Sequence, residues 1–351
     1  MHIKLNGLLY DAKKTEQALA TCEEWEKDIF YFLAAWFNDS DTVVLHTSGS
    51  TGIPKEILLS KTAMRNSAQI TNYFFGMDEY KVALLCLPAS YIAGKMMLVR
   101  AIEGKFNLIT SKPTANPFAE LHSPIDFAAI TPYQLQNSIE NMKKASIRNC
   151  IVGGGSVGLQ LETIAQKIPT ALYETYGMTE TASHIALRRI NGENKSEDFT
   201  VLDGVSIHQD LRGCLVITAP HLSNTEFVTN DIVKLTGDNS FRWIGRADTI
   251  INSGGIKISP EAIEKKLETL IDSPFFITSV PDEALDNRVV LVIESNPYSA
   301  EKEAEFTRKL RHYLQKHEIP RQLFYIPKFV YSVSNKILRK ETLERFTSNK
   351  R

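Results

Sequence analysis

Residues 47–55, Thr47-Ser48-Gly49-Ser50-Thr51-Gly52-Ile53-Pro54-Lys55, carry the strongest structural signal in the chain. They follow an apolar, β-branched run at 42–45 that is typical of a buried strand. Small hydroxyl residues and two glycines let the backbone fold closely around an anion, and Lys55 adds a positive charge. The stretch predicts a phosphate-binding loop, although a Ser/Gly surface turn would have a similar composition. The kinase and GTPase pattern does not fit, because Pro54 precedes Lys55 and Glu56 follows it.

Strand-like and helix-like segments alternate on either side of this loop. Strands are expected at 42–45, 57–59, 82–87, 106–109, 127–130, 149–152 and 170–173, and helices at 15–37, 61–75, 92–103, 132–144 and 158–167. The alternation predicts an α/β domain with a largely parallel sheet. Because phosphate-binding loops belong at the carboxyl ends of the strands in such sheets, we expect the loop at 47–55 there.

The second half of the chain has a different pattern of polar and apolar residues. After Arg188, a polar stretch and several short strand-like runs between 206 and 244 predict a β-rich subdomain. From Ala247 onward a compact tail is expected to fold alone, with helices at 260–270 and 300–317 and strands at 276–280, 289–294 and 323–326. We therefore predict a large N-terminal domain over 1–246 and a small, mobile α+β domain over 247–351.

The composition excludes several classes of partner. Hydrophobic residues make up 43% and charged residues 23% of the chain, as is usual for a soluble globular protein. The 40 basic and 41 acidic residues leave a net charge of −1, without blocks of like charge. We therefore expect small-molecule partners rather than nucleic acid or membrane, and a homo-oligomer is left open.

The cysteines argue against a zinc site and a disulfide framework. Cys22, Cys86, Cys150 and Cys214 lie far apart, which suits a reducing compartment. The N-terminus lacks the long apolar core of a signal peptide, and the apolar stretch at 29–37 is too short to span a bilayer. We predict a cytoplasmic protein.

Two further loops carry residues suited to a nucleotide. In Tyr176-Gly177-Met178-Thr179-Glu180, the aromatic ring could stack on a purine, the hydroxyl could bind a phosphate oxygen and the carboxylate could hold Mg²⁺. Gly153-Gly154-Gly155 follows another expected strand and permits close approach of a flat ring. Each is also compatible with an ordinary turn.

Two motifs lie at and beyond the predicted domain boundary. Arg246, in Gly245-Arg246-Ala247-Asp248, offers donors for hydroxyls or phosphates. The nearby Gly254-Gly255 pair gives a loop able to pack against a moving surface, although a solvent-exposed hairpin would have the same sequence. Lys336 stands in a basic run near the C-terminus, where a solvated charge is the ordinary interpretation.

Taken in order, these motifs resemble those of the adenylate-forming superfamily, which includes acyl-CoA synthetases, the adenylation domains of peptide synthetases and firefly luciferase. The resemblance extends from Thr47 to Arg339. It implies that ATP and a carboxylate give an acyl-adenylate and pyrophosphate, and that the thiol of coenzyme A then displaces AMP. It also implies that Mg²⁺ is required and that residues 47–55 bind phosphates through Thr47, Ser48, Gly49, Ser50, Thr51, Gly52 and Lys55.

The resemblance assigns the catalytic roles. Lys336 is the expected cation between the carboxylate and the phosphate, assisted by Thr179 and by Mg²⁺ on Glu180. For the second step the C-terminal domain is expected to turn about Asp248, which removes Lys336 and brings Gly254-Gly255 to the coenzyme A tunnel. Asn335 departs from the glycine that is usual before this lysine. The chain also starts shortly before the phosphate loop, where most relatives have a further subdomain.

The ribose ligand can be assigned by spacing. The family's ribose-binding aspartate precedes the hinge arginine by fifteen positions, which is the separation of Asp231 from Arg246. Asp238, in a literal Thr236-Gly237-Asp238, is only eight positions away. We therefore predict that Asp231 binds the ribose and that Asp238 is a turn residue.

The acid substrate is indicated by Thr181-Ala182-Ser183, which resembles the o-succinylbenzoate–CoA ligase branch of the superfamily, in menaquinone synthesis. Such an acid has a second carboxylate, for which Lys95 is the candidate cation, with Tyr91 and Ser183 nearby. Tyr91 occupies the position of the family's gate histidine, and Lys95 could equally be a solvated helix residue. Another acyl- or aryl-CoA synthetase, a stand-alone adenylation enzyme and a non-catalytic nucleotide-binding homologue remain alternatives.

Overall fold

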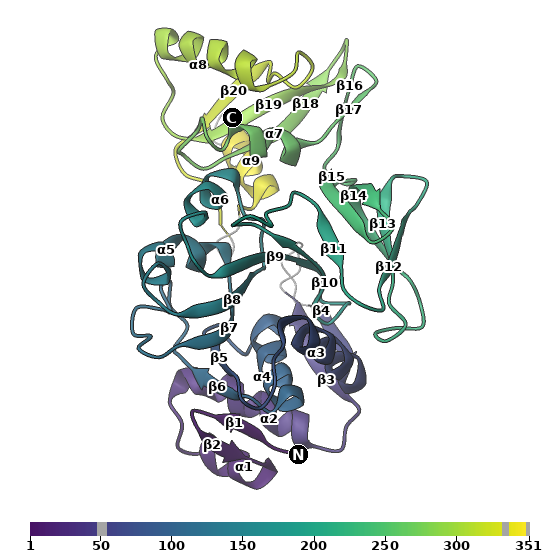
Figure 1. Cartoon of the computed structure of the whole chain (residues 1–351). Coiled ribbons are helices and arrows are strands. Elements are labelled where there is room, and N and C mark those ends of the chain that lie inside the picture. Colours follow the sequence, from purple (N-terminus) through teal and green to yellow (C-terminus); the bar gives the residue numbers. More distant parts are fainter. Residues whose placement is uncertain (48–54, 332–336, 349–351) are drawn as a thin grey trace.

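The computed structural model describes residues 1–47, 55–331 and 337–348. Within them a mixed sheet of 13 strands runs through the larger part of the molecule, in the order β12-β13-β14-β15-β11-β10-β9-β8-β7-β5-β6-β1-β2 (Figure 1). Its strands are β1 Ile3–Leu5, β2 Leu8–Tyr10, β5 Val82–Leu85, β6 Asn107–Thr110, β7 Ile125–Ile130, β8 Ile147–Val152, β9 Ala171–Gly177, β10 His184–Arg189, β11 Phe199–Val201, β12 Ser206–Gln209, β13 Cys214–Thr218, β14 Phe227–Gly237 and β15 Ser240–Arg246.

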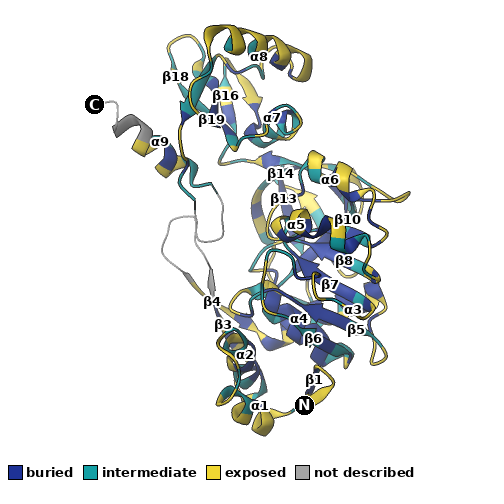
Figure 2. Ribbon diagram, turned by 90° about the vertical axis from the view of Figure 1, so that its left-hand side faces the viewer, coloured by how far each residue is buried: buried dark blue, intermediate teal, exposed yellow. Residues whose placement is uncertain are grey.

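The parallel part of this sheet confirms the predicted α/β domain. Strands β1, β6, β5, β7, β8 and β9 pair in parallel. Alternate residues of β7 enter different cores: Phe127 and Ala129 join one core, whereas Ala128 and Ile130 join the other. Both faces are therefore buried, as Figure 2 shows for the strands at the centre of this domain. The helices of the domain are α1 Ala12–Leu19, α2 Lys27–Phe37, α3 Lys61–Phe75, α4 Ile92–Gly104, α5 Pro132–Met142 and α6 Leu159–Ala165, with a 3₁₀ turn at Glu24–Glu26.

The two strands that flank the predicted phosphate loop are paired differently from our expectation. Strands β3 (Thr42–Thr47) and β4 (Lys55–Ser60) form a separate antiparallel pair, in which Thr47 lies opposite Lys55. The loop therefore joins the two strands of a hairpin and does not follow a strand of the parallel sheet. The segment before β3 also differs, because the expected helix at 15–37 is interrupted between α1 and α2.

Beyond β9 the sheet becomes antiparallel. Strands β10 to β15 supply the expected β-rich region and bury a core of their own, which includes Phe199 and Phe241. This region is continuous with the parallel part through the pairing of β10 with β9 and of β11 with β15. The expected strand at 170–173 is also longer than predicted, because β9 continues to Gly177.

A smaller α+β unit follows β15. Its sheet contains β16 Ile251–Ser253, β17 Ile256–Ile258, β18 Phe275–Asp282, β19 Asp286–Glu294 and β20 Gln322–Ile326, packed with α7 Pro260–Leu267, α8 Ala300–Tyr313 and α9 Arg339–Ser348. Its cores contain residues from 251 onward only. The two sheets are joined by residues 247–250, which include Asp248. The β16–β17 hairpin agrees with one of the two interpretations of the Gly254-Gly255 region, whereas α9 was not expected from the sequence.

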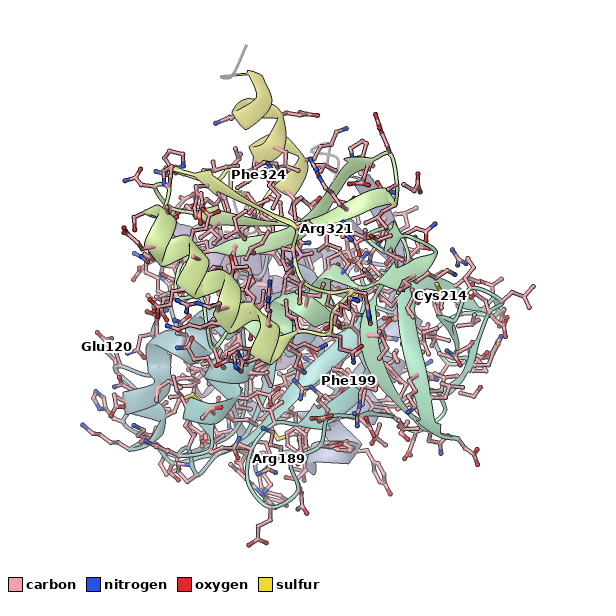
Figure 3. All side chains as sticks on the ribbon, turned by 90° about the horizontal axis from the view of Figure 1, so that it is seen from above. Glu120, Arg189, Phe199, Cys214, Arg321 and Phe324 are labelled. Carbon is pink, nitrogen blue, oxygen red and sulfur yellow. The ribbon has the colours of Figure 1, made fainter. Side chains whose placement is uncertain are left out.

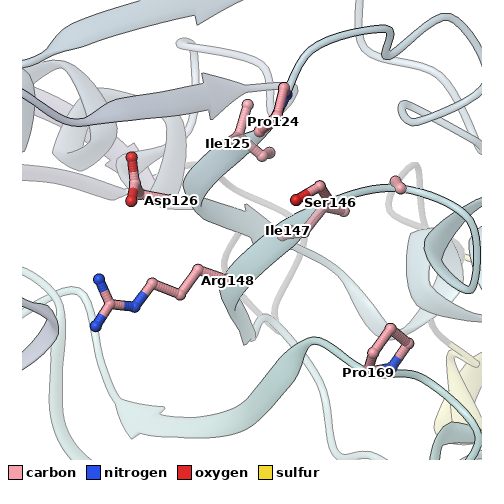
Figure 4. Close-up of a pocket in the computed structure, with 8 residues that line it drawn as sticks. Pro124, Ile125, Asp126, Ser146, Ile147, Arg148 and Pro169 are labelled. Atoms are coloured by element: carbon pink, nitrogen blue, oxygen red, sulfur yellow. The ribbon is translucent and has the colours of Figure 1, made fainter.

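One cavity lies away from the expected ligand-binding end of the parallel sheet. It has a volume of about 320 Å³ and opens between Pro124, Asp126, Ser146, Arg148 and Pro169 (Figure 4). It lies at the amino ends of β7 and β8, whereas ligands of parallel sheets bind at the carboxyl ends. In the described part of the chain, no helix has the length and apolarity needed to cross a bilayer.

Candidate functional site

Three predicted nucleotide-binding residues meet near the carboxyl end of β9. The hydroxyl of Tyr176 donates a hydrogen bond of 2.6 Å to Oδ2 of Asp231, and Nη1 of Arg246 lies 3.6 Å from Oδ1 of the same carboxylate. Antiparallel pairing of β14 with β15 places Asp231 opposite Arg246. Burial, and then the Asp231 charge, raise the pKa of Tyr176, so its phenol stays protonated and donates. The geometry thus joins residues that lie 55 and 15 positions apart in the sequence.

The ring of Tyr176 is fixed by two phenylalanines. Its centroid lies 5.8 Å from that of Phe199 and 5.0 Å from that of Phe241, in tilted and edge-on geometries. Phe199 lies near the middle of the molecule as seen from above (Figure 3). A ring held in this way is preorganised, which suits the predicted contact with a purine.

The backbone around Asp231 is also held in place. The amide of Asp231 donates to the hydroxyl of Thr229, which donates in turn to the carbonyl of Leu215. Asp238 has a different environment, since it lies in the exposed turn between β14 and β15. The predicted turn role of Asp238 is confirmed, and ribose binding by Asp231 stays a prediction.

The glycine-rich loop after β8 is held close to β9. The Gly153 amide donates to the carbonyl of Ile130, and a Cβ at position 153 would collide with the Thr175 hydroxyl. Gly154 has φ +83°, a conformation that favours glycine. The adjoining Gly155 could carry a Cβ with only ordinary contact to Pro132. Close approach to the neighbouring strand therefore explains Gly153, and backbone conformation explains Gly154.

A buried ion cluster supports the end of this loop. The carboxylate of Glu174 accepts a 2.7 Å hydrogen bond from the Val157 amide and pairs with Arg188, which also pairs with Glu162. Burial raises the pKa of Glu174, whereas Arg188 opposes this shift. Since removing one member would leave an unpaired charge, this cluster fixes residues 153–157 relative to β9.

The turn between β9 and β10 carries the predicted catalytic pair. Thr179 is half-buried and Glu180 is exposed. The Thr181 hydroxyl donates within the turn and also accepts from the Met178 amide, and a Cβ on Gly177 would collide with the backbone of Ser183. Mg²⁺ commonly keeps several waters and takes only one or two carboxylates beside the substrate phosphates. The single exposed carboxylate of Glu180 fits that mode of binding.

Several predicted residues cannot be placed at the site. Ser48, Gly49, Ser50, Thr51, Gly52 and Lys336 lie outside the described residues, and only the backbone of Thr47 and Lys55 is described. Gly254 and Gly255 form the tip of the β16–β17 hairpin, both with positive φ. This hairpin belongs to the smaller unit and lies apart from β9 (Figure 1). The structure therefore does not bring these glycines to Tyr176.

The predicted acid-binding residues surround the start of α4. Tyr91 precedes the helix and is 47% exposed. The Nζ of Lys95 donates to the carbonyls of Ala89 and Ser90, both at 2.7 Å. Two of its three donors are therefore used to hold the preceding loop, which weakens the case for Lys95 as the cation that receives a carboxylate.

A different cation, which we did not predict, occupies this region. Arg100 of α4 is 1% exposed, and its Nη2 donates a 2.6 Å hydrogen bond to Oγ of Ser183. Its Nε has no partner, and within the described chain no carboxylate pairs with it. Burial lowers its pKa to about 9. The signal in the sequence was a single arginine inside the apolar run at 96–102, which is unusual for a buried helix face.

The neighbours of Arg100 are neutral. His184 is buried, with Nδ1 3.3 Å from the Ser183 hydroxyl and Nε2 3.3 Å from that of Thr71. Burial, and then the charge of Arg100, lower the pKa of His184 well below its usual value. The group Arg100–Ser183–His184 is thus rich in donors and carries an uncompensated positive charge. An anionic group is the ligand that would complete it.

The fold and these residues define a two-unit, nucleotide-binding α/β enzyme. Residues 4–206 match the model of the family described as AMP-binding enzyme. The chain belongs to this family, as the order of the motifs predicted.

Individual relatives agree with this assignment. A 2-succinylbenzoate–CoA ligase from Bacillus mycoides is 26% identical over 341 residues, which cover 85% of this chain and 69% of the relative. The solved structure of an acyl-CoA synthetase (AMP-forming)/AMP-acid ligase II-like protein from Dyadobacter fermentans is 34% identical, with a TM-score of 0.63 and coverage of 96% of this chain and 98% of that chain. The O-succinylbenzoate coenzyme A synthetase of Bacillus subtilis shares the fold, with a TM-score of 0.71, 21% identity and coverage of 86% of this chain and 69% of that chain.

Proposed function

We propose that this chain is an ATP-dependent acid–CoA ligase whose acid is 2-succinylbenzoate. The observation that carries the substrate assignment is Arg100, a buried cation without a carboxylate partner in the described chain, bound to the Ser183 hydroxyl. 2-Succinylbenzoate has two carboxylates. One is activated, and the other supplies the counter-ion that Arg100 lacks. The sequence similarity to 2-succinylbenzoate–CoA ligases supports the same choice.

The nucleotide is held by the residues gathered at β9 and β14–β15. Asp231 accepts hydrogen bonds from the ribose hydroxyls through the carboxylate that Tyr176 and Arg246 position. The rigid ring of Tyr176 and the Gly153–Gly155 loop bind the purine, while residues 47–55 bind the phosphates. Glu180 and Thr179 lie at the reacting end. Glu180 would hold Mg²⁺, which when bound neutralises charge on the phosphates.

In the first half-reaction, a carboxylate oxygen of the acid attacks the α-phosphorus of ATP. The new O–P bond forms as the bond to pyrophosphate breaks, and the products are the acyl-adenylate and pyrophosphate. Two anions must meet, and the positive charge of Lys336 opposes their repulsion. Arg100 prevents unproductive binding by holding the second carboxylate away from the phosphate.

In the second half-reaction, the sulfur of coenzyme A attacks the acyl carbon. The C–S bond forms, the C–O bond to AMP breaks and the thiol proton passes to solvent. The smaller unit turns about Asp248 between the two steps, so that Lys336 leaves and the Gly254-Gly255 hairpin approaches the thiol. In the described orientation, Asp248 accepts two 2.9 Å hydrogen bonds from Arg246. Four separated cysteines favour a cytoplasmic location for this chemistry.

The test is an acid panel measured in both half-reactions. Pyrophosphate exchange is followed with 2-succinylbenzoate, benzoate, a fatty acid and an amino acid, and thioester formation is then followed with coenzyme A. The proposal expects exchange and thioester with 2-succinylbenzoate, and a much lower kcat/KM with benzoate, which lacks the second carboxylate. Preference for a different acid would reassign the substrate. ATP binding without exchange on any acid would indicate a non-catalytic homologue.

A further inference from the structure

A carboxylate of the smaller unit is bonded to the start of helix α6 in the larger one. Glu268 is the C-terminal cap of α7, and its Oε2 accepts a 2.7 Å hydrogen bond from the amide of Leu159, the first residue of α6. The Glu268 side chain is partly buried, and burial raises its pKa. An amide at a helix start needs an acceptor from outside its own helix, and here the other unit supplies it.

Gly158 shows that this contact is close. A Cβ at position 158 would overlap Glu268, with its Cδ at 2.8 Å and Oε1 at 2.9 Å. The backbone of Gly158 has φ −70° and ψ 160°, which any residue adopts. Its glycine identity is therefore explained by the neighbouring carboxylate and not by its own conformation. Any orientation that moved Glu268 away would remove this restriction.

The contact joins the segment that forms the proposed purine site. Residues 153–155 lead directly into 157–159, where Glu174 holds the Val157 amide and Glu268 holds the Leu159 amide. One carboxylate comes from the larger unit and the other from the smaller unit. The position of the smaller unit is thus linked, through three residues of backbone, to the end of the nucleotide loop.

The same face of α7 also holds the segment that follows Lys336. Glu264 lies one helical turn before Glu268 and accepts a 2.8 Å hydrogen bond from Nη2 of Arg339, the first residue of α9. Ile337 is bridged to Tyr331. The helix that contacts α6 through Glu268 therefore also binds Arg339, three positions after Lys336 in the sequence.

We propose that Glu268 is a positioning residue, which sets the smaller unit in the orientation used for adenylate formation by bonding to Leu159 beside Gly158. This inference rests on the proposed function, because it takes Lys336 to act in the first half-reaction. Glu268 does not touch the reactants. It acts by holding the first residue of α6, the helix that follows the nucleotide loop in the chain.

The experiment compares Gly158→Ala, Glu268→Ala and the double variant in both half-reactions. Adenylate formation is measured by pyrophosphate exchange, and thioester formation is measured from synthetic acyl-adenylate and coenzyme A. Glu268→Ala should slow the first step about three- to tenfold, as expected for one lost hydrogen bond. Gly158→Ala should slow it by a similar factor, because the added methyl displaces the Glu268 carboxylate from the Leu159 amide. The second step should change less than twofold in either variant.

The double variant provides the decisive comparison. Once Glu268 is shortened to alanine, the methyl at position 158 no longer meets the carboxylate, so the double variant should match Glu268→Ala alone. Additive losses, or equal losses in both half-reactions, would overturn the proposal. Glu305→Ala is the matched control, since it removes an exposed carboxylate of α8 that pairs with Lys309.

A readout independent of activity separates this inference from the proposed function. Hydrogen–deuterium exchange of a peptide that contains the Leu159 amide in its interior should accelerate in Glu268→Ala and remain unchanged in Glu305→Ala. Unchanged exchange in Glu268→Ala would show that the contact does not form in solution. Absence of pyrophosphate exchange by the unaltered protein on every acid would instead refute the proposed function, whatever the deuterium result.

Discussion

Replacing Arg100 with methionine should stabilise the protein while removing its preference for a dicarboxylate. The pKa of Arg100 falls from 12.5 to about 9 because the side chain is buried. At about 1.4 kcal/mol per pH unit, this fall means that burial disfavours the charged form by roughly 5 kcal/mol. Methionine removes that cost and fills a similar volume, but it loses the hydrogen bond to Ser183, worth about 1–3 kcal/mol. A net gain of about 2–4 kcal/mol in the free energy of unfolding is expected.

The same substitution should weaken binding of 2-succinylbenzoate. A buried cation that receives a carboxylate typically contributes about 2–5 kcal/mol when one partner is truncated, so KM should rise roughly 30-fold or more. The KM for ATP should not change, because Arg100 contacts Ser183 and Met97 and none of the Tyr176, Asp231 and Arg246 group. Activity on benzoate should change little, since benzoate has no second carboxylate.

The assay pairs pyrophosphate exchange with thermal unfolding, each with and without the acid. In the unaltered protein 2-succinylbenzoate should raise the melting temperature, and in Arg100→Met it should not. Lys95→Met is the control, because its ammonium is already bonded to two carbonyls. An unchanged KM for 2-succinylbenzoate in Arg100→Met, or a selective rise in Lys95→Met alone, would exclude Arg100 as the cation that binds the second carboxylate.

Three further predictions test other parts of the site. Lys336→Ala should reduce adenylate formation by about 10²–10³ and spare thioester formation from preformed adenylate; equal loss in both would contradict its assigned role. Asp231→Asn should raise the KM for ATP at least about tenfold, whereas Asp238→Asn should leave it unchanged; the reverse result in steady-state kinetics would exchange the two assignments. Burial and Arg100 lower the pKa of His184 below its usual 6.5, so the unfolded chain binds a proton that the folded chain does not. The free energy of unfolding should therefore fall by about 1 kcal/mol between pH 7.5 and 5.5, and urea titrations of His184→Asn should show a smaller fall.

The sequence predicted the parallel domain because its strands are buried on both faces and are separated by helices. That pattern can be recognised within short stretches of sequence. The glycine and aromatic residues of the nucleotide motifs can be recognised in the same way. The spacing argument for Asp231 also held as far as the structure tests it, because Asp238 lies in a turn. In contrast, the pairing of Asp231 with Arg246 and their approach to Tyr176 depend on strand register, which no local pattern reports.

The misplaced strand pair and the overlooked Arg100 have the same cause. The run at 42–45 has the composition of a buried strand in any sheet, so the sequence could not distinguish a separate hairpin from the parallel sheet. Likewise, Lys95 and Arg100 lie on one helix five positions apart, and both are basic. Only the tertiary structure shows that the Lys95 ammonium is bonded to the carbonyls of the preceding loop while Arg100 is buried without a counter-ion.

An uncompensated charge in a core needs a physical justification. Met96, Met97, Leu98 and Val99 of α4 are fully buried, and an apolar residue at position 100 would extend this packing at lower cost. Arg100 is tolerable in the free protein because an apolar core of this size can carry a destabilisation of a few kcal/mol. The cost is recovered only when an anion arrives, so a monocarboxylate that is consumed at the phosphate leaves Arg100 unpaired. Under the proposed function, selection between acids follows from the cost of leaving Arg100 unpaired, and a variant that relieves this cost should lose selectivity.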